Sequence, residues 1–307
     1  MPTLSAPVRD RPVLPHLALL GVQALFGSLP VIGKIVLAVI PNLALVGFRV
    51  GITAAILYAA QRSRGTLRLT RSRDYWHLAG LSLIGVVLNQ IFYIDGLSRT
   101  RASNAALLAV TIPVFAMIAG TIAGTERLRV GGLIGIAAAI GGVLLFIDPM
   151  SASFSAETTA GDALIILNSA AYGAYVALSK NVIVRNGALR SMTWLFLFAS
   201  LVCVPLGAVS LFSIDVLSVS RDIWIMVLFI AAAATAAPYL LNAWALARVE
   251  PSTVAVYIYL QPLIGFVLAA AFLRETIGLK FIISAALVFF GVFLVSRKPH
   301  SAAAKQF

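Results

Sequence analysis

Polar side chains recur at helical spacing inside long apolar stretches of the sequence. Between residues 160 and 184, Asn168 and Tyr172 are four residues apart and Tyr175 follows three residues later, so all three share one helix face. The full set of such residues is Asn89, Tyr93, Asn168, Tyr172, Tyr175, Tyr239, Asn242, Tyr257 and Gln261. Because polar groups are expensive within a membrane, these faces predict a substrate-binding cavity, with hydrogen bonding between helices as the alternative.

Three cations also lie within the apolar stretches. Lys34, Lys180 and Arg49 each cost about 2.5–3.5 kcal/mol to insert into a bilayer unless the charge reaches water or a partner. They are candidate charge gates for a substrate carboxylate or phosphate. The alternatives are that the two lysines extend to the membrane surfaces, and that Arg49 binds a helix end or a buried carboxylate.

The acidic residues limit the mechanism. Asp95, Glu126, Glu250 and Glu275 lie near the ends of apolar stretches, and no Asp or Glu lies at the middle of one, where a proton-carrying carboxylate is expected. Proton coupling would therefore use one of these junction acids, whereas facilitated diffusion or exchange is equally compatible. Glu126 and Glu275, which are followed by cations, are expected to anchor helix ends and loops.

The sequence contains no pattern that indicates catalysis. Its three histidines, His16, His77 and His300, lie far from one another and from paired acids, whereas acid–base or metal chemistry clusters such groups. A glycine-rich phosphate loop is absent as well. We therefore predict no catalytic residue, no bound metal and no cofactor, which argues against an enzyme. A channel is also disfavoured, because the sequence has no charged or carbonyl filter motif.

The composition places these residues in a membrane protein. Of the 307 residues, 61% are hydrophobic and 11% are charged, against about 25% charged in a typical soluble domain. This excludes a soluble enzyme, a disordered chain and a nucleic-acid-binding domain, although the net charge is +12. The single cysteine, Cys203, rules out a disulfide within the chain and is expected to be buried.

Ten apolar stretches have the length of a membrane-spanning helix, about 20 residues. Their approximate bounds are 15–37, 42–61, 75–96, 101–124, 129–148, 160–184, 189–211, 221–247, 251–273 and 279–297. Alternation with a period of two is absent, so we predict an all-α integral membrane protein with ten transmembrane helices. Arginine and lysine gather in alternate connections, which predicts that the tails 1–14 and 298–307 are both cytoplasmic.

The second half of the chain repeats the first. With an offset of 149, several residues coincide without a gap, as in Arg99/Arg248, Ser103/Ser252, Pro113/Pro262, Glu126/Glu275 and Gly142/Gly291. Nearer the N-terminus the offset is 146 and pairs Lys34 with Lys180. Residues 15–148 thus correspond to 160–297. Because each half holds five helices, an odd number, the two halves are expected to be inverted repeats, as in many secondary transporters.

The repeated segments around the prolines resemble a known transporter family. TIPVFAMIAGTIAGTERL lies over LQPLIGFVLAAAFLRETI, with a proline in the fourth and ninth helices and a glutamate at the junction after each. This pattern resembles the drug/metabolite transporter superfamily, and more narrowly a pair of EamA domains over nearly the whole chain. The resemblance implies a central cavity lined by the first, third, fourth, sixth, eighth and ninth helices. The polar faces fall on five of these six, the first of them through Gln23 and Phe26.

These features predict a secondary transporter that moves a small polar or amphipathic metabolite, such as an amino acid, by alternating access. Export is the expected direction, and the cell inner membrane is the expected location. Tyrosine, asparagine and glutamine suit such a solute, whereas a multidrug cavity is mostly apolar. The alternatives are broad-specificity drug efflux and uptake of a small organic anion. The expected partners are a small-molecule substrate and the lipid bilayer, and not nucleic acid.

Small residues and prolines leave two questions of packing open. Gly131, Gly135 and Ala139 form a stripe in the fifth helix, which indicates either close packing inside the protein or the face of a homodimer. The chain is accordingly predicted to be a monomer or a homodimer. Pro113 and Pro262 are expected to kink their helices, either as hinges for alternating access or as static bends.

Overall fold

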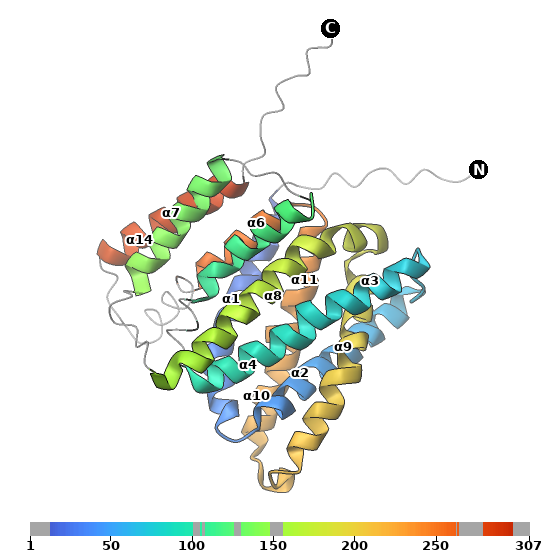
Figure 1. Ribbon diagram of the computed structural model, residues 1–307. Helices are drawn as coiled ribbons and strands as arrows, with labels where there is room; N and C mark the ends of the chain where they lie inside the picture. The colour runs from blue at the N-terminus through green and yellow to red at the C-terminus, as the bar shows by residue number, and fades with distance from the viewer. Residues whose placement is uncertain are drawn as a thin grey trace, which may run out of the picture.

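The computed structural model describes residues 13–100, 105, 108–125, 130–147, 156–261, 263 and 279–296, and every regular element within them is helical (Figure 1). The first half holds α1 (Leu14–Leu37), α2 (Asn42–Arg64), α3 (Ser72–Ser82), η1 (Leu83–Leu88), α4 (Asn89–Arg99), η2 (Ala109–Thr111), α6 (Ile112–Ile122) and α7 (Val130–Ile147). The second half holds α8 (Ala156–Asn186), α9 (Ala188–Leu211), η4 (Val216–Ser218), α10 (Arg221–Ala231), η5 (Ala232–Ala236), α11 (Ala237–Leu246), α12 (Pro251–Val256), η6 (Tyr257–Leu260) and α14 (Leu279–Ser296).

Six helices in the described part of the chain are long and apolar enough to cross a membrane: Leu14–Leu37, Asn42–Arg64, Ser72–Arg99, Thr159–Asn186, Ala188–Leu211 and Arg221–Leu246. The shorter apolar helices are Ile112–Ile122, Val130–Gly142, Pro251–Leu260 and Ile282–Val295. Each predicted span therefore overlaps an apolar helix, and six of these helices reach spanning length. The number of membrane crossings stays a prediction.

Several predicted features lie outside the described residues. They are most of the N-terminal tail, the C-terminal tail, Ser103, Glu126, Pro262, Glu275 and His300.

The helices carry large apolar side chains on the outside of the protein and polar side chains inside. Leu201 and Val209 of α9 and Phe289 of α14 are exposed, whereas Gln23 is buried. Lipid favours this distribution, because it solvates apolar side chains and leaves polar ones without partners. Cys203 is 1% exposed, as predicted.

Corresponding helices of the two halves pack against each other. α2 lies along α9, and α7 lies along α14 at one end of the molecule (Figure 1). These pairs are the second with the seventh and the fifth with the tenth of the predicted helices. α1 packs on α11, and α4 packs on α8. In the repeat α1 corresponds to α8 and α4 to α11, so these two contacts are equivalent. The helix contacts thus follow an approximate two-fold relation between the halves.

Glycines let α7 and α14 approach closely. A Cβ on Gly135 or on Gly142 would lie 2.8 Å from a carbonyl oxygen of α14, that of Gly291 or Ser284 respectively. The residue number rises along one helix as it falls along the other, so the pair is antiparallel. The offset of 149 relates Gly135 to Ser284 and Gly142 to Gly291, which makes the two approaches equivalent.

The small-residue stripe in α7 is therefore divided between two environments. Gly135 and Ala139 face α14, where a Cβ on Gly291 would lie 2.8 Å from the backbone nitrogen of Ala139. Gly131 lies one turn earlier, and nothing in the described part of the chain lies within 4 Å of its Cβ position. Two of the three residues thus serve packing inside the protein.

Two long helices are interrupted at corresponding positions. α3 and α4 form one helix through the π-helical turn η1, and α10 and α11 form another through the π-helical turn η5. The turns begin at Leu83 and Ala232, which the offset of 149 relates. In η5 the sequence supplies a cause, because Pro238 has no N–H to donate to the carbonyl of Ala234.

Proline also explains a tightened turn before α6. Pro113 is the second residue of α6 and cannot donate to the carbonyl of Ala109, where the 3₁₀ turn η2 begins. The 3₁₀ turn η6 ends at Leu260, two residues before Pro262 in the sequence, and overlaps the residues that the offset of 149 relates to η2. The predicted kink at Pro113 is thus a local change of helix type.

Candidate functional site

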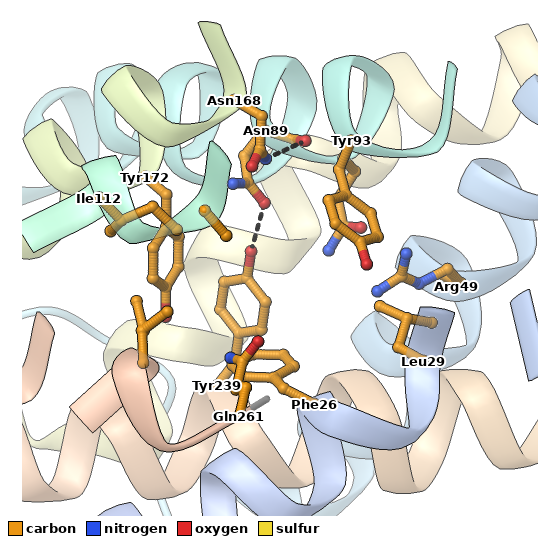
Figure 2. A pocket seen from close by; sticks show the side chains of 13 residues that line it. Phe26, Leu29, Arg49, Asn89, Tyr93, Ile112, Asn168, Tyr172, Tyr239 and Gln261 are labelled. Carbon is orange, nitrogen blue, oxygen red and sulfur yellow. Dashed lines mark hydrogen bonds between the residues drawn. The ribbon is translucent and has the colours of Figure 1, made fainter. Parts of the chain in front are cut away.

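A cavity of about 80 Å³ lies between the two halves of the chain (Figure 2). Seven of the predicted site residues line it: Arg49, Asn89, Tyr93, Asn168, Tyr172, Tyr239 and Gln261. The rest of its wall is formed by Phe26, Leu29, Gln90, Ala109, Ile112 and Ile258. The helices that the resemblance implies all contribute, and α2 joins them through Arg49.

Asn89 connects three helices at the cavity wall. The Nδ2 of Asn168 in α8 donates to the backbone oxygen of Asn89 in α4 across 2.8 Å. The hydroxyl of Tyr239 in α11 lies 2.9 Å from the carbonyl oxygen of Gly85 and 3.0 Å from Oδ1 of Asn89, two acceptors that share its proton. The same side chains therefore line the cavity and join the helices, so the two alternatives for the polar faces coexist.

Tyr239 is also the centre of an aromatic cluster. The ring of Phe26 lies edge-on at 6.3 Å and that of Tyr172 edge-on at 6.2 Å between centroids. Tyr175, at 6.3 Å from Tyr239, does not line the cavity. Its ring packs on the backbone of Gly85, where any Cβ would clash with it. Gly85 thus gives Tyr175 its place in the core and offers its carbonyl to Tyr239.

Two other predicted residues lie beside the cavity and not at its wall. The Nδ2 of Asn242 donates to the hydroxyl of Tyr172 across 2.8 Å, so Asn242 holds a lining residue in place. The hydroxyl of Tyr257 lies 2.7 Å from Nδ1 of His16, which joins η6 to α1. Both residues act as supports in this geometry.

Gln261 makes a second link between the first and ninth predicted helices. Its Nε2 donates to Oε1 of Gln23 across 2.8 Å. Gln23 is buried, and its neighbour on the same helix face, Phe26, lines the cavity. α1 and η6 therefore meet at the cavity.

Arg49 is the charged residue among the described lining residues. It is 1% exposed, and its Nε donates to Oγ1 of Thr235 across 3.1 Å. Its Nη1 is buried without a hydrogen-bond partner in the described part of the chain. The partner shown for Arg49 is thus a hydroxyl and not the carboxylate considered above. Figure 2 shows the guanidinium pointing into the cavity beside Tyr93, on the side opposite Tyr172.

The interrupted helix positions the partner of Arg49. Thr235 lies in η5, and its Oγ1 also donates to the carbonyl oxygen of Ile230 across 2.8 Å. The Oγ1 of Thr53 donates to the carbonyl oxygen of Ala231 across 3.0 Å. Both carbonyls lie where the helix changes register, so the two hydroxyls satisfy backbone groups that the π-helical turn alters.

Lys34 and Lys180 bind carbonyls at the ends of other helices, and neither lines the cavity. Nζ of Lys34 donates to the carbonyl oxygen of Thr100 across 2.9 Å, and Nζ of Lys180 donates to that of Val249 across 2.7 Å. The offset of 149 relates Thr100 to Val249, so the two bonds are equivalent. Each lysine binds the backbone just after α4 or α11, where the helix dipole favours a cation.

Asp95 anchors a helix end. Its Oδ1 accepts from Nδ2 of Asn42 and its Oδ2 from Nε of Arg99, each at 3.0 Å. Within the described residues, no group of three or more His, Cys, Asp or Glu side chains is placed to hold a metal ion.

Two acids that the spacing arguments did not select are more deeply buried. Asp162, 7% exposed, accepts from Oγ1 of Thr100 at 2.6 Å, next to the carbonyl that Lys34 binds. Asp74, 2% exposed, accepts three hydrogen bonds from Arg185, which joins the start of α3 to the end of α8. Asp74 lies in the first turn of α3, where the helix dipole stabilises a carboxylate.

Gln90 and Thr235 are site residues that helical spacing does not select. The offset of 149 relates Gln90 to Tyr239, so the repeat itself marks Gln90 as a lining residue. Thr235 stands in an alanine-rich run and carries no comparable signal. Its role follows from its contact with Arg49, 186 residues away in the chain.

Comparisons with known proteins give a consistent picture. A model of the EamA-like transporter family matches residues 14–147 and 159–297. An uncharacterized transporter of Archaeoglobus fulgidus is 26% identical over 228 residues, which are 74% of this chain and 78% of the relative. The uncharacterized transporter YetK of Bacillus subtilis is 24% identical over 283 residues, 91% of this chain and 86% of that protein. A WAT1-related protein of Arabidopsis thaliana is 26% identical over 257 residues, 70% of this chain and 65% of that protein.

A solved crystal structure shares the fold. It superposes with a TM-score of 0.73 at 18% identity, and the match covers 92% of this chain and 96% of that one.

Proposed function

Because the chain belongs to the EamA-like transporter family, we propose that it is a secondary transporter of a small polar or amphipathic metabolite, such as an amino acid. Family membership and the apolar helices identify a multi-pass membrane transporter rather than an enzyme. The proposal adds alternating access, export as the direction, the cell inner membrane as the location and cytoplasmic termini.

The observation that carries the proposal is the cavity between the halves. Its wall combines the amides of Asn89, Asn168 and Gln261 with the aromatic rings of Phe26 and Tyr172. Its volume of about 80 Å³ is below the roughly 300–1,000 Å³ of sites that hold drug-sized ligands. Size and polar lining together favour a small solute over broad drug efflux.

The two-fold relation between the halves supports alternating access. Secondary transporters built from inverted repeats place the substrate at the repeat interface and open it to either side in turn. Here the cavity lies at that interface, and the equivalent bonds of Lys34 and Lys180 tie down the ends of α4 and α11. Two equivalent hydrogen bonds, one from each lysine, suit a transporter in which one bond breaks when the cavity opens to one side and the other bond breaks when it opens to the opposite side.

Counterflow in proteoliposomes tests the proposal. Vesicles are loaded with an unlabelled amino acid, and the entry of the same labelled amino acid is followed without an ion gradient. Transient accumulation above equilibrium is expected for at least one class of amino acid. Absence of accumulation across the whole amino-acid panel would overturn an amino acid as the substrate.

Two substitutions connect the transport to the cavity. Asn168→Ala and Gln261→Ala are expected to lower counterflow at least severalfold while the protein still reaches the membrane in normal amounts. Tyr58→Ala, on the exposed side of α2, serves as the control. Normal counterflow in both cavity variants would contradict the assignment of this cavity to the substrate.

A further inference from the structure

The cavity wall contains a cation whose hydrogen-bonding capacity is only partly used. Arg49 is 1% exposed, and the described structure shows one hydrogen bond from its five N–H donors, the bond to Thr235. Its Nη1 is buried and unpartnered. Figure 2 shows this side chain directed into the cavity, so an occupant of the cavity would meet the guanidinium.

Burial of an unpaired charge is strongly unfavourable, because the protein interior does not replace the water that the charge loses. Thr235 is neutral, and the other described lining residues, Tyr93 among them, carry no charge at neutral pH. The charge of Arg49 is therefore balanced by no carboxylate in the described wall. An anion bound in the cavity would supply both the charge and the missing hydrogen-bond acceptor.

We infer that Arg49 binds the carboxylate of the transported solute and that the substrates are small monocarboxylates, amino acids among them. This inference rests on the proposed function and adds the chemical class of the substrate. The guanidinium is a planar fork that matches a carboxylate with two parallel hydrogen bonds.

The number of charges favours a monoanion over a phosphate or a dicarboxylate. Arg49 is the one cation in the described cavity wall. Lys34 and Lys180, which are the other cations considered as gates, bind backbone carbonyls at helix ends. A dianion in this cavity would keep one negative charge unbalanced, whereas a single carboxylate is neutralised by Arg49 alone. An amino acid also brings an ammonium group, for which the wall offers amide oxygens such as that of Gln261 as hydrogen-bond acceptors.

The remaining wall gives the solute an orientation. Arg49 and Tyr93 lie on one side of the cavity, and Tyr172 and Ile112 lie on the other (Figure 2). A carboxylate at Arg49 directs the apolar part of the solute towards Tyr172 and Ile112. The amide of Gln261 lies within the same wall and offers an acceptor or a donor to an amino or hydroxyl group.

Ligand-induced thermal stabilisation of the purified full-length protein in detergent tests the inference without requiring transport. The probes are leucine, 4-methylpentanoate, which lacks the amino group, leucinamide, which lacks the carboxylate, and 3-methylbutylamine, which also lacks it. Both carboxylates are expected to raise the melting temperature in a saturable way, and the amide and the amine are not. The same assay with alanine and phenylalanine extends the panel to smaller and larger side chains.

Variants at position 49 connect the binding to the guanidinium. Arg49→Gln is expected to raise the apparent Kd for the carboxylates about tenfold or more, since hydrogen bonds to charged groups are strong. Arg49→Lys keeps the charge but loses the fork, so an intermediate affinity is expected. Arg62→Gln changes an exposed arginine of the same helix and is expected to leave the affinity unchanged.

Three results would overturn the inference: equal stabilisation by leucinamide, an unchanged carboxylate affinity in Arg49→Gln, or no stabilisation by any carboxylate of the panel. If Arg49→Gln does not fold, Arg49→Lys and the comparison of leucine with leucinamide decide the matter. Counterflow with the same solutes separates the two proposals. Transport of leucinamide as fast as leucine would refute the inference and leave a transporter, whereas Arg49-dependent binding without counterflow would refute transport of these solutes and leave the binding site.

Discussion

The Tyr239 hydroxyl joins the two halves of the chain beside the cavity, because it belongs to the second half and both of its acceptors belong to the first. Tyr239→Phe leaves the ring in place and removes the donor. A buried acceptor that loses its donor costs about 1–3 kcal/mol, so the variant is expected to unfold at a lower temperature. The measurement is thermal unfolding in detergent, with Tyr58→Phe on the exposed face of α2 as the control. An unchanged melting temperature would show that the hydrogen bonds from this hydroxyl to the carbonyl of Gly85 and the side-chain amide of Asn89 do not stabilise the protein.

The equivalent hydrogen bonds of Lys34 and Lys180 allow a prediction about access to the cavity from the two sides of the membrane. In the proposed topology Lys34 lies near the outer end and Lys180 near the inner end of the membrane. Lys34→Met is expected to increase access to the cavity from outside and Lys180→Met from inside, each about tenfold, since a hydrogen bond from a charged group is lost. Access is measured as the labelling rate of a cysteine placed at Ala109 by a membrane-impermeant thiol reagent added to either side.

The background for this measurement is favourable, because Cys203 is the single native cysteine and is 1% exposed. The two lysine variants act as controls for each other. An increase from the same side in both variants would contradict the two-fold relation between the bonds of Lys34 and Lys180.

Contact between α7 and α14 depends on residues without side chains. Gly142→Val places atoms where the carbonyl of Ser284 and the side chain of Val288 lie, so a loss of about 1–3 kcal/mol is expected. Gly131→Val, on the same helix, meets open space and is expected to be tolerated. Melting temperatures in detergent compare the two variants. If Gly131→Val were the more damaging one, or separated a dimer in gel filtration, this face of α7 would contact a second copy of the chain.

Periodicity and the internal repeat together predict much of the site from sequence. Asn168 and Tyr172 lie on one face at helical spacing and both line the cavity, and the offset of 149 connects Gln90 to Tyr239. Tyr175 shares that face, yet its ring packs against the backbone of Gly85 and does not reach the cavity. The helical period shows on which face of its helix a side chain lies, but not whether that face meets a cavity or another helix. Cavity lining and core packing therefore have the same pattern in the sequence.

Other features depend on contacts between distant segments. The partner of Arg49 is a threonine in an alanine-rich run, and only the packing of α2 on α10 and η5 brings the two together. The π-helical turn at Ala232 has a sequence cause in Pro238, whereas its counterpart at Leu83 has no proline at the corresponding position, Asn89. Backbone irregularities of this kind follow from tertiary packing, which single-sequence patterns do not contain.

Inversion of the two halves across the membrane gives the last prediction. The repeat gives each half an odd number of spans, and the odd number in the second half places residue 151 and the C-terminus on opposite sides. The arginine- and lysine-rich connections place the C-terminus inside. Alkaline phosphatase, which is active only outside the cytoplasm, is expected to be active when fused after Ser151 and inactive when fused after His300. Equal activity at both positions would mean an even number of spans in the second half and, through the repeat, in the first half as well. Equivalent helices would then cross the membrane in the same direction, and the antiparallel, two-fold pairing of α7 with α14 through Gly135 and Gly142 would have no origin in the repeat.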